Sequence, residues 1–233
     1  MNRMDPLAGT PWSTPATVQG FARSEPNEVL IDYARRLAER HPGRRVLDVG
    51  CGAGRNAVPL ARLGWSVLGP DLSLPMLEAA HARAVHELRP GRLDVALAPM
   101  QALPVRSRSI DLVIAHGIWN LATSGAQFRA GVREAARVTR PGAGLFVFTF
   151  SRHTLADDAQ PVDGERFVFT QFSGRPQCFL TEAELIAEMA DAGFAPDPAV
   201  PVTEYNRPAA GMLRSSGGPV IYEAAFCYLP TAV

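Results

Sequence analysis

Short apolar runs alternate with segments of helical periodicity along most of the chain. The strand-like runs lie at residues 45–49, 66–71, 93–97, 110–115 and 144–150. Segments whose apolar positions recur at helical spacing lie between them, at 56–63, 74–88 and 127–138. Two more candidate strands, near 200–205 and 221–229, follow a last helix at about 181–193. This alternation predicts an α/β domain with a parallel sheet and helices on both of its faces.

Two segments depart from this rhythm. Residues 1–24 are rich in Pro, Thr, Gly and Ala and lack periodicity, which predicts an irregular arm. We expect Ser24 to cap a helix that ends near residue 41. Residues 151–180 are polar with scattered Phe and Pro, and a capping box at Thr181 and Glu184 closes them. We therefore expect an N-terminal lid at 1–43 and a ligand-binding domain at 44–233, with a substrate-loop insert at about 151–180.

The composition excludes several kinds of enzyme. All 23 basic residues of the 233-residue chain are arginine, and 23 acidic residues balance them. Enzymes that use a Schiff base or pyridoxal phosphate, and P-loop ATPases, need a lysine, so none of these can be built here. Zero net charge also argues against a long nucleic-acid footprint, which requires an excess of cations.

The cysteines and the apolar runs bear on the compartment. Cys51, Cys178 and Cys227 are odd in number and widely spaced, which predicts a reduced, cytoplasmic chain without a structural metal site. The N-terminus lacks the apolar core of a signal peptide. The apolar stretch at 145–150 is too short to cross a bilayer, so no membrane association is expected.

A glycine loop carries the clearest functional signal. The strand at 45–49 runs directly into Gly50, Gly52 and Gly54, and a helix follows at once. Glycines are needed where a turn is tight and where a ligand lies against the backbone, and a helix N-terminus adds free N–H groups. Asp71, 21 residues after Gly50, ends the next strand, where a carboxylate can accept hydrogen bonds from a ribose.

Two details of the loop decide which nucleotide is expected. The third glycine of a dinucleotide fingerprint would fall at Arg55, so that fingerprint is absent. Asp48 precedes the first glycine by two residues, and its carboxylate would repel a pyrophosphate. The loop therefore favours a ligand that carries positive charge at this place.

With these motifs in view, the chain resembles the class I S-adenosylmethionine-dependent methyltransferases. The resemblance rests on five stretches between residues 44 and 229: 48–54, 71–80, 102–114, 137–145 and 180–194. It implies a Rossmann-like, seven-stranded, mostly parallel sheet with an antiparallel last strand. Gly54-Arg55-Asn56 resembles the subgroup that methylates small molecules.

The resemblance also implies a set of cofactor-binding residues. The glycines would line the methionine part, Asp48 would sit near its ammonium group, and Asp71 would hold the ribose. The full set is Asp48, Gly50, Cys51, Gly52, Arg55, Asn56, Asp71, Leu72, Met76, Pro99, Met100, Gln101 and His116. Pro99 stands where the family usually has an acid that binds the adenine amine, so adenine would rely on the Met100 backbone and Gln101.

The loop after the strand at 110–115 should face the methyl acceptor. His116 is the candidate catalytic residue, either as a general base or as a group that only lines the site. Trp119, Asn120, His153, Trp12 and Phe21 are candidate substrate contacts, and the aromatic ones can equally be packing residues. The Asn/Asp-Pro-Pro-aromatic motif of DNA amino methyltransferases is absent.

We therefore expect a methyltransferase that acts on a small molecule by in-line displacement, as a monomer or homodimer. S-adenosylmethionine would be the cofactor and S-adenosylhomocysteine its product. Two alternatives stay open: an RNA- or protein-directed methyltransferase, and a cofactor-binding protein without turnover. Balanced charge opposes the first, and Pro99 is the one feature that favours the second.

Overall fold

The computed structural model describes residues 4–207 and 218–230. Its helices, including three short 3-10 turns, are η1 (Pro11–Ser13), α1 (Pro15–Arg23), α2 (Glu28–Arg40), α3 (Ala57–Arg62), α4 (Leu74–Glu87), η2 (Trp119–Leu121), α5 (Gly125–Val138), η3 (Arg152–Thr154) and α6 (Glu182–Asp191). Its strands are β1 (Arg45–Val49), β2 (Ser66–Asp71), β3 (Leu93–Leu97), β4 (Ile110–His116), β5 (Thr139–Phe150), β6 (Val168–Phe169), β7 (Gln177–Cys178), β8 (Phe194–Pro196), β9 (Thr203–Tyr205) and β10 (Ile221–Tyr228).

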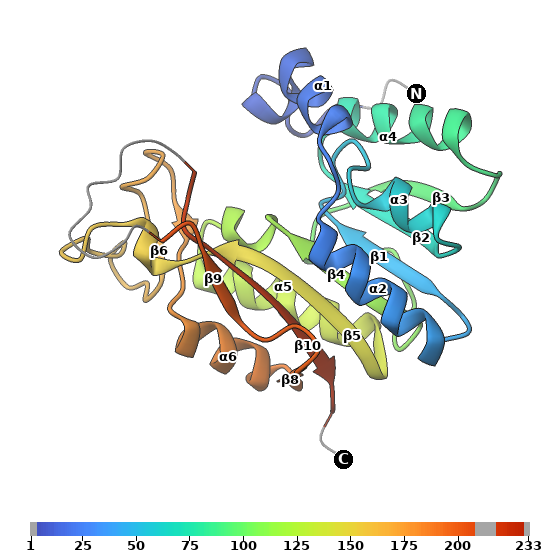
Figure 1. Cartoon of the computed structure of the whole chain (residues 1–233). Coiled ribbons are helices and arrows are strands. Elements are labelled where there is room, and N and C mark those ends of the chain that lie inside the picture. Colours follow the sequence, from blue (N-terminus) through green and yellow to red (C-terminus); the bar gives the residue numbers. More distant parts are fainter. Residues whose placement is uncertain (1–3, 208–217, 231–233) are drawn as a thin grey trace.

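One mixed sheet organises the chain (Figure 1). Its strand order is β3-β2-β1-β4-β5-β10-β8, and β9 pairs with β10 beside β8. Strands β1 to β5 are parallel, whereas β10 runs antiparallel to both β5 and β8. The predicted Rossmann-like sheet with its antiparallel last strand is therefore confirmed.

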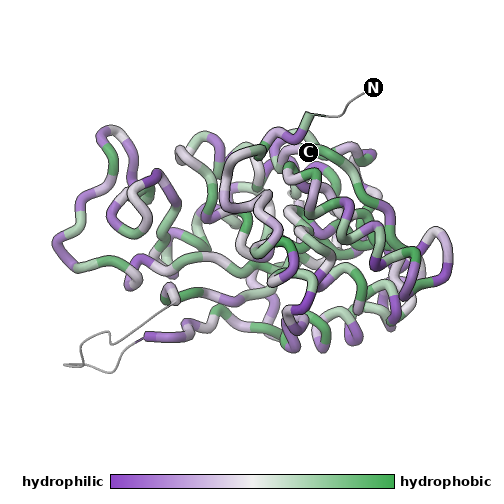
Figure 2. The backbone as a smooth tube through the Cα atoms, turned by 90° about the horizontal axis from the view of Figure 1, so that it is seen from above, coloured by the Kyte–Doolittle hydropathy of each residue, from purple (hydrophilic) through white to green (hydrophobic). Residues whose placement is uncertain are grey.

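Helices cover both faces of the sheet. On one face, α2 and α3 pack on alternate residues of the central strands, as Leu30 and Phe146 illustrate. On the other face, α5 and α6 pack on the intervening residues, such as Leu145. Neighbouring residues of a strand point to opposite faces, so the near-continuous apolar runs fill two cores. Figure 2 shows hydrophobic residues along the central strands and hydrophilic ones in the outer loops.

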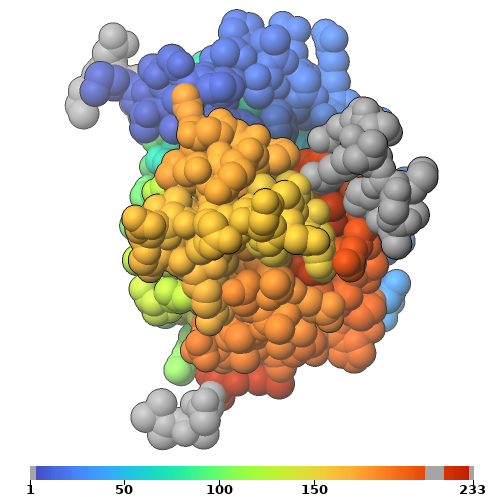
Figure 3. Space-filling view, turned by 90° about the vertical axis from the view of Figure 1, so that its left-hand side faces the viewer, coloured from blue at the N-terminus to red at the C-terminus, as the bar shows by residue number. Residues whose placement is uncertain are grey.

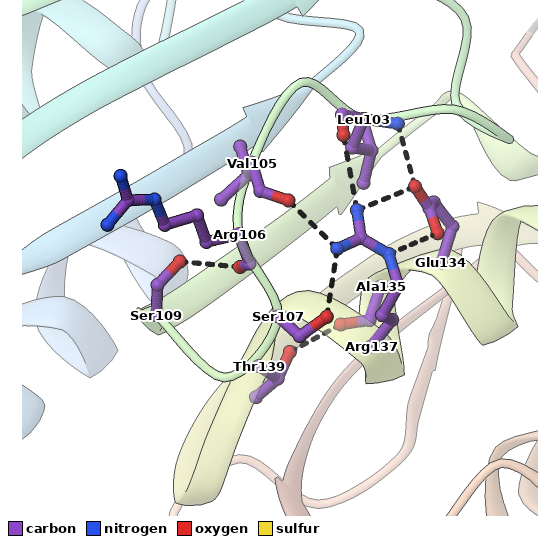
Figure 4. Close-up of polar contacts among 9 residues, drawn as sticks. All are labelled: Leu103, Val105, Arg106, Ser107, Ser109, Glu134, Ala135, Arg137 and Thr139. Carbon is purple, nitrogen blue, oxygen red and sulfur yellow. Dashed lines mark hydrogen bonds and ion pairs between the residues drawn. The ribbon is translucent and has the colours of Figure 1, made fainter.

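The junction of α5 and β5 differs from its predicted form. The sequence pattern predicted a helix at 127–138 and a strand that begins at 144, but β5 begins at Thr139, directly after α5. Arg137 fixes this junction, because its guanidinium donates to Glu134, Leu103 O, Val105 O and Ser107 Oγ (Figure 4). One side chain thus ties the loop before β4 to the end of α5.

The N-terminal arm is more ordered than the sequence indicated. Thr14 caps α1, a helix without a fully buried side chain, which the sequence analysis did not predict. Ser24 does not begin a helix as predicted but ends α1. Asn27 caps α2 instead, with its Oδ1 accepting from Leu30 N at 2.9 Å. The short 3-10 helix η1 and the helix α1 thus replace the predicted irregular arm.

The sixth strand of the predicted sheet is split. We expected one strand near 200–205, but β8 pairs with residues 226–228 of β10 and β9 pairs with 221–223. A turn closed by Val200 N donating to Asp197 O separates them. Pro196, Pro198 and Pro201 lack N–H groups, so this stretch cannot form one continuous ladder.

Between β5 and α6 the chain forms a small satellite unit. Strands β6 and β7 pair with each other, and Phe150, Phe169, Phe172 and Phe179 contact one another around them. The capping box of Thr181 and Glu184 is present as predicted. The face in Figure 3 displays both the blue N-terminal arm and the yellow and orange insert. No helix in the described ranges is long and apolar enough to span a membrane.

Candidate functional site

The site lies where the parallel strands end. β1, β2 and β4 are neighbours in the sheet and run in the same direction, so their C-terminal ends meet at one edge. Asp48 stands near the end of β1, Asp71 ends β2 and His116 ends β4. The order of the strands thus brings together three predicted site residues that are up to 68 positions apart in the chain. Such an edge is where open α/β sheets bind ligands.

The glycine loop after β1 needs glycine for steric reasons. Gly50, Gly52 and Gly54 have φ of +71°, +53° and +79°, in the left-handed region that side chains disfavour. A Cβ on Gly50 would lie 2.7 Å from Ile118 Cδ1, and one on Gly54 would lie 3.2 Å from Val58 Cγ2. The loop is therefore held close to α3 and to the turn after β4.

Asp71 binds the loop rather than standing free. Its Oδ2 accepts from Gly52 N and its Oδ1 from Ser73 N, both at 2.8 Å. Burial raises the pKa of this carboxyl, and the backbone hydrogen bonds oppose that rise. Asp71 thus fixes Gly52 against the start of α4. A carboxylate can accept further bonds, so the predicted ribose contact remains a prediction.

Asp48 is a buried carboxylate with little support. Only 2% of it is exposed, and no residue in the described part of the chain donates a hydrogen bond to it. Burial raises its pKa to about 7, Arg55 opposes the rise and Asp71 adds to it. A buried carboxylate without a hydrogen bond is costly unless a cation approaches it. Asp48 therefore fits a positively charged ligand group next to the glycine loop.

Arg55 extends from the loop to the end of β4. Its Nη2 lies 2.9 Å from Nε2 and 3.1 Å from Nδ1 of His116. The imidazole also stacks on Phe148 of β5, with ring centroids 4.3 Å apart. Burial and then the Arg55 charge lower the pKa of His116 to about 3. This lowered pKa favours His116 as a neutral group that lines the site over His116 as a general base, and its role stays a prediction.

Two residues that the sequence analysis missed complete this group. Asn27, the cap of α2, directs its Nδ2 to His116 Nε2 at 3.3 Å and to the Glu223 carboxylate of β10. Its backbone N–H donates to Asn56 Oδ1 at 3.0 Å. The side chain of Asn56, predicted to bind cofactor, thus holds the start of α2 against the glycine loop.

Signals for both missed residues existed in the sequence. Asn is a strong N-cap, but the choice of Ser24 as the cap of this helix concealed Asn27. Glu223 is the one charged residue in the apolar run 221–228, and a lone acid in such a run calls for a partner or a role.

A cavity of about 470 Å³ opens beside this group. The N-terminus of α2, β5, β9 and β10 contribute its walls. Six of the residues that line it are Asn27, Val29, Phe148, Tyr205, Ile221 and Glu223. Because Phe148 also stacks on His116, the cavity adjoins the end of β4. Its size suits a small organic molecule.

The arm reaches the other side of the loop. A Cβ on Gly52 would lie 3.8 Å from both Phe21 Cδ1 and Met76 Sδ. Phe21 contacts Trp12 with ring centroids 6.1 Å apart, and Ser73 Oγ lies 3.2 Å from Trp12 O. The arm therefore packs over the predicted cofactor loop, whereas Trp12 and Phe21 are not among the residues lining the cavity.

The other residues predicted to bind the cofactor differ in how deeply their side chains are buried. Cys51 is buried, and a Cβ on Gly69 would lie 2.6 Å from its Sγ, so its side chain points beneath the loop. Met100 is buried near Gly131. Pro99 is exposed, while Leu72 and Gln101 are half-buried near the ends of β2 and β3.

Three predicted substrate residues are not brought to the cavity. Trp119 is 1% exposed and packs edge-on against Phe128, which favours the packing role that the sequence analysis also allowed. Asn120 is equally buried, and its Oδ1 has no hydrogen-bond partner among the described residues. His153 pairs with Glu204 of β9, with Nδ1 2.7 Å from Oε1, instead of joining His116.

Comparisons with known proteins identify the family of the chain. A family model described as a methyltransferase domain matches residues 46–142. A demethylmenaquinone methyltransferase of Corynebacterium efficiens is 37% identical over 173 residues, which covers 68% of each chain. Another, of Corynebacterium urealyticum, is 37% identical over 118 residues, 50% of this chain but only 46% of that relative. This second alignment thus spans less than half of the relative's length.

A solved structure has the same fold. The 1,6-didemethyltoxoflavin-N1-methyltransferase of Burkholderia thailandensis, with bound 1,6-didemethyltoxoflavin and S-adenosylhomocysteine, superposes with a TM-score of 0.62. The match covers 88% of this chain and 80% of that one at 20% identity. At this identity the likeness concerns the fold.

Proposed function

The chain belongs to the family of S-adenosylmethionine-dependent methyltransferases, and from this premise we propose that it methylates a small molecule held in the cavity beside His116. The observation that carries the proposal is Asp48, a buried carboxylate at the glycine loop without a hydrogen bond from the described residues. A cationic amino acid cofactor supplies the partner that this carboxylate needs.

The residues at the strand ends fit this cofactor. Asp48 would receive its ammonium group, the left-handed glycines would lie against its methionine part, and Asp71 would accept from its ribose. Arg55, the cation nearest to Asp48, is suited to the cofactor's carboxylate. The bound cofactor supplies an electrophilic methyl group on a sulfonium.

The chain's own contribution to the chemistry is mainly positioning. The neutral ring of His116, fixed by Arg55, Asn27 and Phe148, shapes the boundary between the cofactor loop and the cavity without adding charge. An acceptor in the cavity would be held near the cofactor's methyl group, and such alignment supplies much of the rate of a displacement. Burial of these groups limits water at the same place.

Three observations favour a small acceptor over RNA or protein. The cavity has the volume of a small-ligand site. The chain has no net charge to attract nucleic acid. The names of the relatives describe methylation of demethylmenaquinone, which is a small molecule and not a nucleic acid or a protein. We place the reaction in the cytoplasm, because all three cysteines are free thiols. A monomer or homodimer would suffice for it.

We further propose that residues 1–43 and the insert at 151–180 form the cover of the site. Phe21 of α1 lies over Gly52, and Phe150 at the start of the insert packs against Phe172 and Phe179. The arm before α2 and the insert lie on the side where the parallel strands end, which favours a role in enclosing the ligands, whereas α2 packs on a face of the sheet.

Calorimetry with S-adenosylhomocysteine tests the proposal. We expect the wild-type protein to bind it with a micromolar dissociation constant and Asp48→Ala to weaken binding at least about tenfold, since a charged hydrogen bond contributes about 1.5–3 kcal/mol. Glu78→Ala, at an exposed position of α4, is the matched control and should bind like wild type. Absence of binding by the folded wild-type protein would refute the proposal.

A further inference from the structure

The acceptor cavity has an unusual feature in its otherwise apolar strand wall, namely the carboxylate of Glu223. We propose that the methyl acceptor is a small amine whose basic nitrogen is bound by Glu223, with its apolar or aromatic body held against Phe148 and Ile221. This inference rests on the proposed function, and it adds the chemical class of the substrate and the residue that selects it.

Glu223 is buried at a place where a charge is expensive. It lies in the middle of β10, is 7% exposed and lines the cavity. Within residues 4–207 and 218–230, the one hydrogen bond that its carboxylate accepts comes from Asn27 Nδ2. An ionised carboxylate can accept about four hydrogen bonds. A donor that enters the cavity can therefore use acceptor sites that the protein leaves free.

The charge of the surroundings favours a cation as this donor. Arg55 is the basic residue whose charge interacts with Glu223, but the same guanidinium also interacts with Asp48, and more strongly. Glu28, exposed in the first turn of α2, adds a negative charge at the rim of the cavity. With the cofactor's ammonium on Asp48 and its carboxylate on Arg55, as proposed above, the charge of Glu223 would remain without a cationic partner. An acceptor with its own positive charge would neutralise it.

The position of Glu223 places the nitrogen near the proposed site of methyl transfer. His116, Phe148 and Glu223 are consecutive partners across β4, β5 and β10. The same Asn27 amide contacts both His116 and Glu223, so the carboxylate lies beside the imidazole. The Phe148 ring between them offers its surface to a flat group or to a cation.

Methylation of an ammonium group also requires an acceptor for one proton. An ammonium group has no lone pair, so it must lose a proton before it can attack. Glu223 would take this proton and become a carboxylic acid, and the freed lone pair would form the new C–N bond while the S–C bond of the cofactor breaks and its electron pair stays on sulfur. The proton on Glu223 then leaves to water, so the net change is one methylated ammonium, S-adenosylhomocysteine and one proton.

Binding of three matched probes to the protein saturated with S-adenosylhomocysteine tests this inference. Tyramine, 4-hydroxyphenethyl alcohol and 3-(4-hydroxyphenyl)propionate share one aromatic body and carry a cationic, a neutral and an anionic tail. We expect tyramine to bind at least about tenfold more tightly than the alcohol, the smallest gain expected from a hydrogen bond to a charged group, and the propionate to bind weakest. Isothermal calorimetry measures all three.

Three variants make the test specific. Glu223→Gln should bring the affinities for tyramine and the alcohol to within about threefold of each other, because its amide keeps the shape but loses the charge. Glu223→Asp keeps the charge and should keep the order of the probes. Glu25→Gln, exposed before α2 and not a lining residue, is the matched control and should bind all probes like wild type.

The possible results separate this inference from the proposed function. Failure of the wild-type protein to bind S-adenosylhomocysteine would refute the proposed function itself. Binding of that product together with no preference for tyramine, with no measurable binding of tyramine, or with an unchanged preference in a folded Glu223→Gln variant would overturn the amine proposal alone. Retained product binding and an unchanged circular dichroism spectrum identify the variants as folded.

Discussion

The guanidinium of Arg55 lies within 3.1 Å of both ring nitrogens of His116. A cation in this position opposes protonation of the imidazole, and burial opposes it more strongly. The histidine at the end of β4 is therefore a neutral, hydrogen-bonded spacer between the glycine loop and the cavity. The lowered pKa of His116 favours a role in positioning the ligands over a role in proton transfer.

His116 should not titrate in the physiological range. With its pKa lowered to about 3, its ring should stay neutral between pH 5 and 8. Proton NMR of the five histidines tests this, with the His116 resonance assigned by its loss in a His116→Gln variant. Free histidine added to the sample is the internal control, because an unperturbed imidazole titrates near pH 6.5. A His116 inflection near pH 6.5 would contradict the neutral state.

Binding of S-adenosylhomocysteine should strengthen as the pH rises through 7. Burial raises the pKa of Asp48 to about 7, so below that pH the free protein carries a neutral acid. An ammonium ligand favours the ionised form, so binding releases a proton, and the affinity should fall up to about tenfold for each pH unit below 7. Calorimetry at pH 6, 7 and 8 measures this dependence. Asp48→Asn should remove it, and an unchanged slope in that variant would exclude Asp48 as its source.

Asp71→Ala should reduce both stability and affinity. Loss of its carboxylate leaves the N–H groups of Gly52 and Ser73 without their acceptor, which costs about 1–3 kcal/mol for each buried donor. The cofactor contact would be lost as well. Thermal unfolding with and without S-adenosylhomocysteine separates the two effects. Asp94→Ala, at an exposed position of β3, is the control. A variant as stable as wild type would contradict the role of Asp71 in holding the loop.

Phe21→Ala should weaken cofactor binding without unfolding the domain. Phe21 approaches the Gly52 backbone from α1, a helix with no buried residue, so its loss removes cover from the loop but little from the core. We expect S-adenosylhomocysteine to dissociate several-fold faster in stopped-flow measurements. Gln19→Ala, exposed on the same helix, should leave the rate unchanged. Equal rates in both variants would refute the proposed cover.

Gly50→Ala should destabilise the protein more than the same change at a comparable glycine. Gly50 and Gly142 have φ of +71° and +77°, so alanine costs about 1–2 kcal/mol of backbone energy at either position. At Gly50 the new Cβ would also lie 2.7 Å from Ile118 Cδ1, whereas at Gly142 it would meet nothing within 4 Å. Denaturant unfolding should show a larger decrease in the free energy of unfolding for Gly50→Ala than for Gly142→Ala. Equal decreases would mean that the Ile118 side chain moves aside without an energetic penalty.

Site features that depend on neighbouring residues could be predicted from the sequence, whereas features that depend on residues far apart in the sequence could not. The glycine loop, Asp48 and Asp71 were found from the sequence because a turn, a strand end and a helix start are encoded by neighbouring residues. His116 was found at the end of its strand, but its ionisation was not, since Arg55 lies 61 positions away. The sequence left Trp119 open between a substrate contact and a packing residue, because an aromatic residue after a strand can face either a ligand or the core.

The sequence alone determined the alternation of strands and helices, the order of the motifs and hence the family resemblance, since hydrophobic periodicity and glycine requirements are local. Tertiary structure decided the rest. Only the folded sheet places Glu223 beside Asn27 and His116, which are 196 and 107 positions away. These contacts depend on the position of β10 between β5 and β8 in the sheet, and no local sequence pattern indicates that position. The charge of the acceptor cavity, and with it the chemistry proposed for the substrate, arises from that placement.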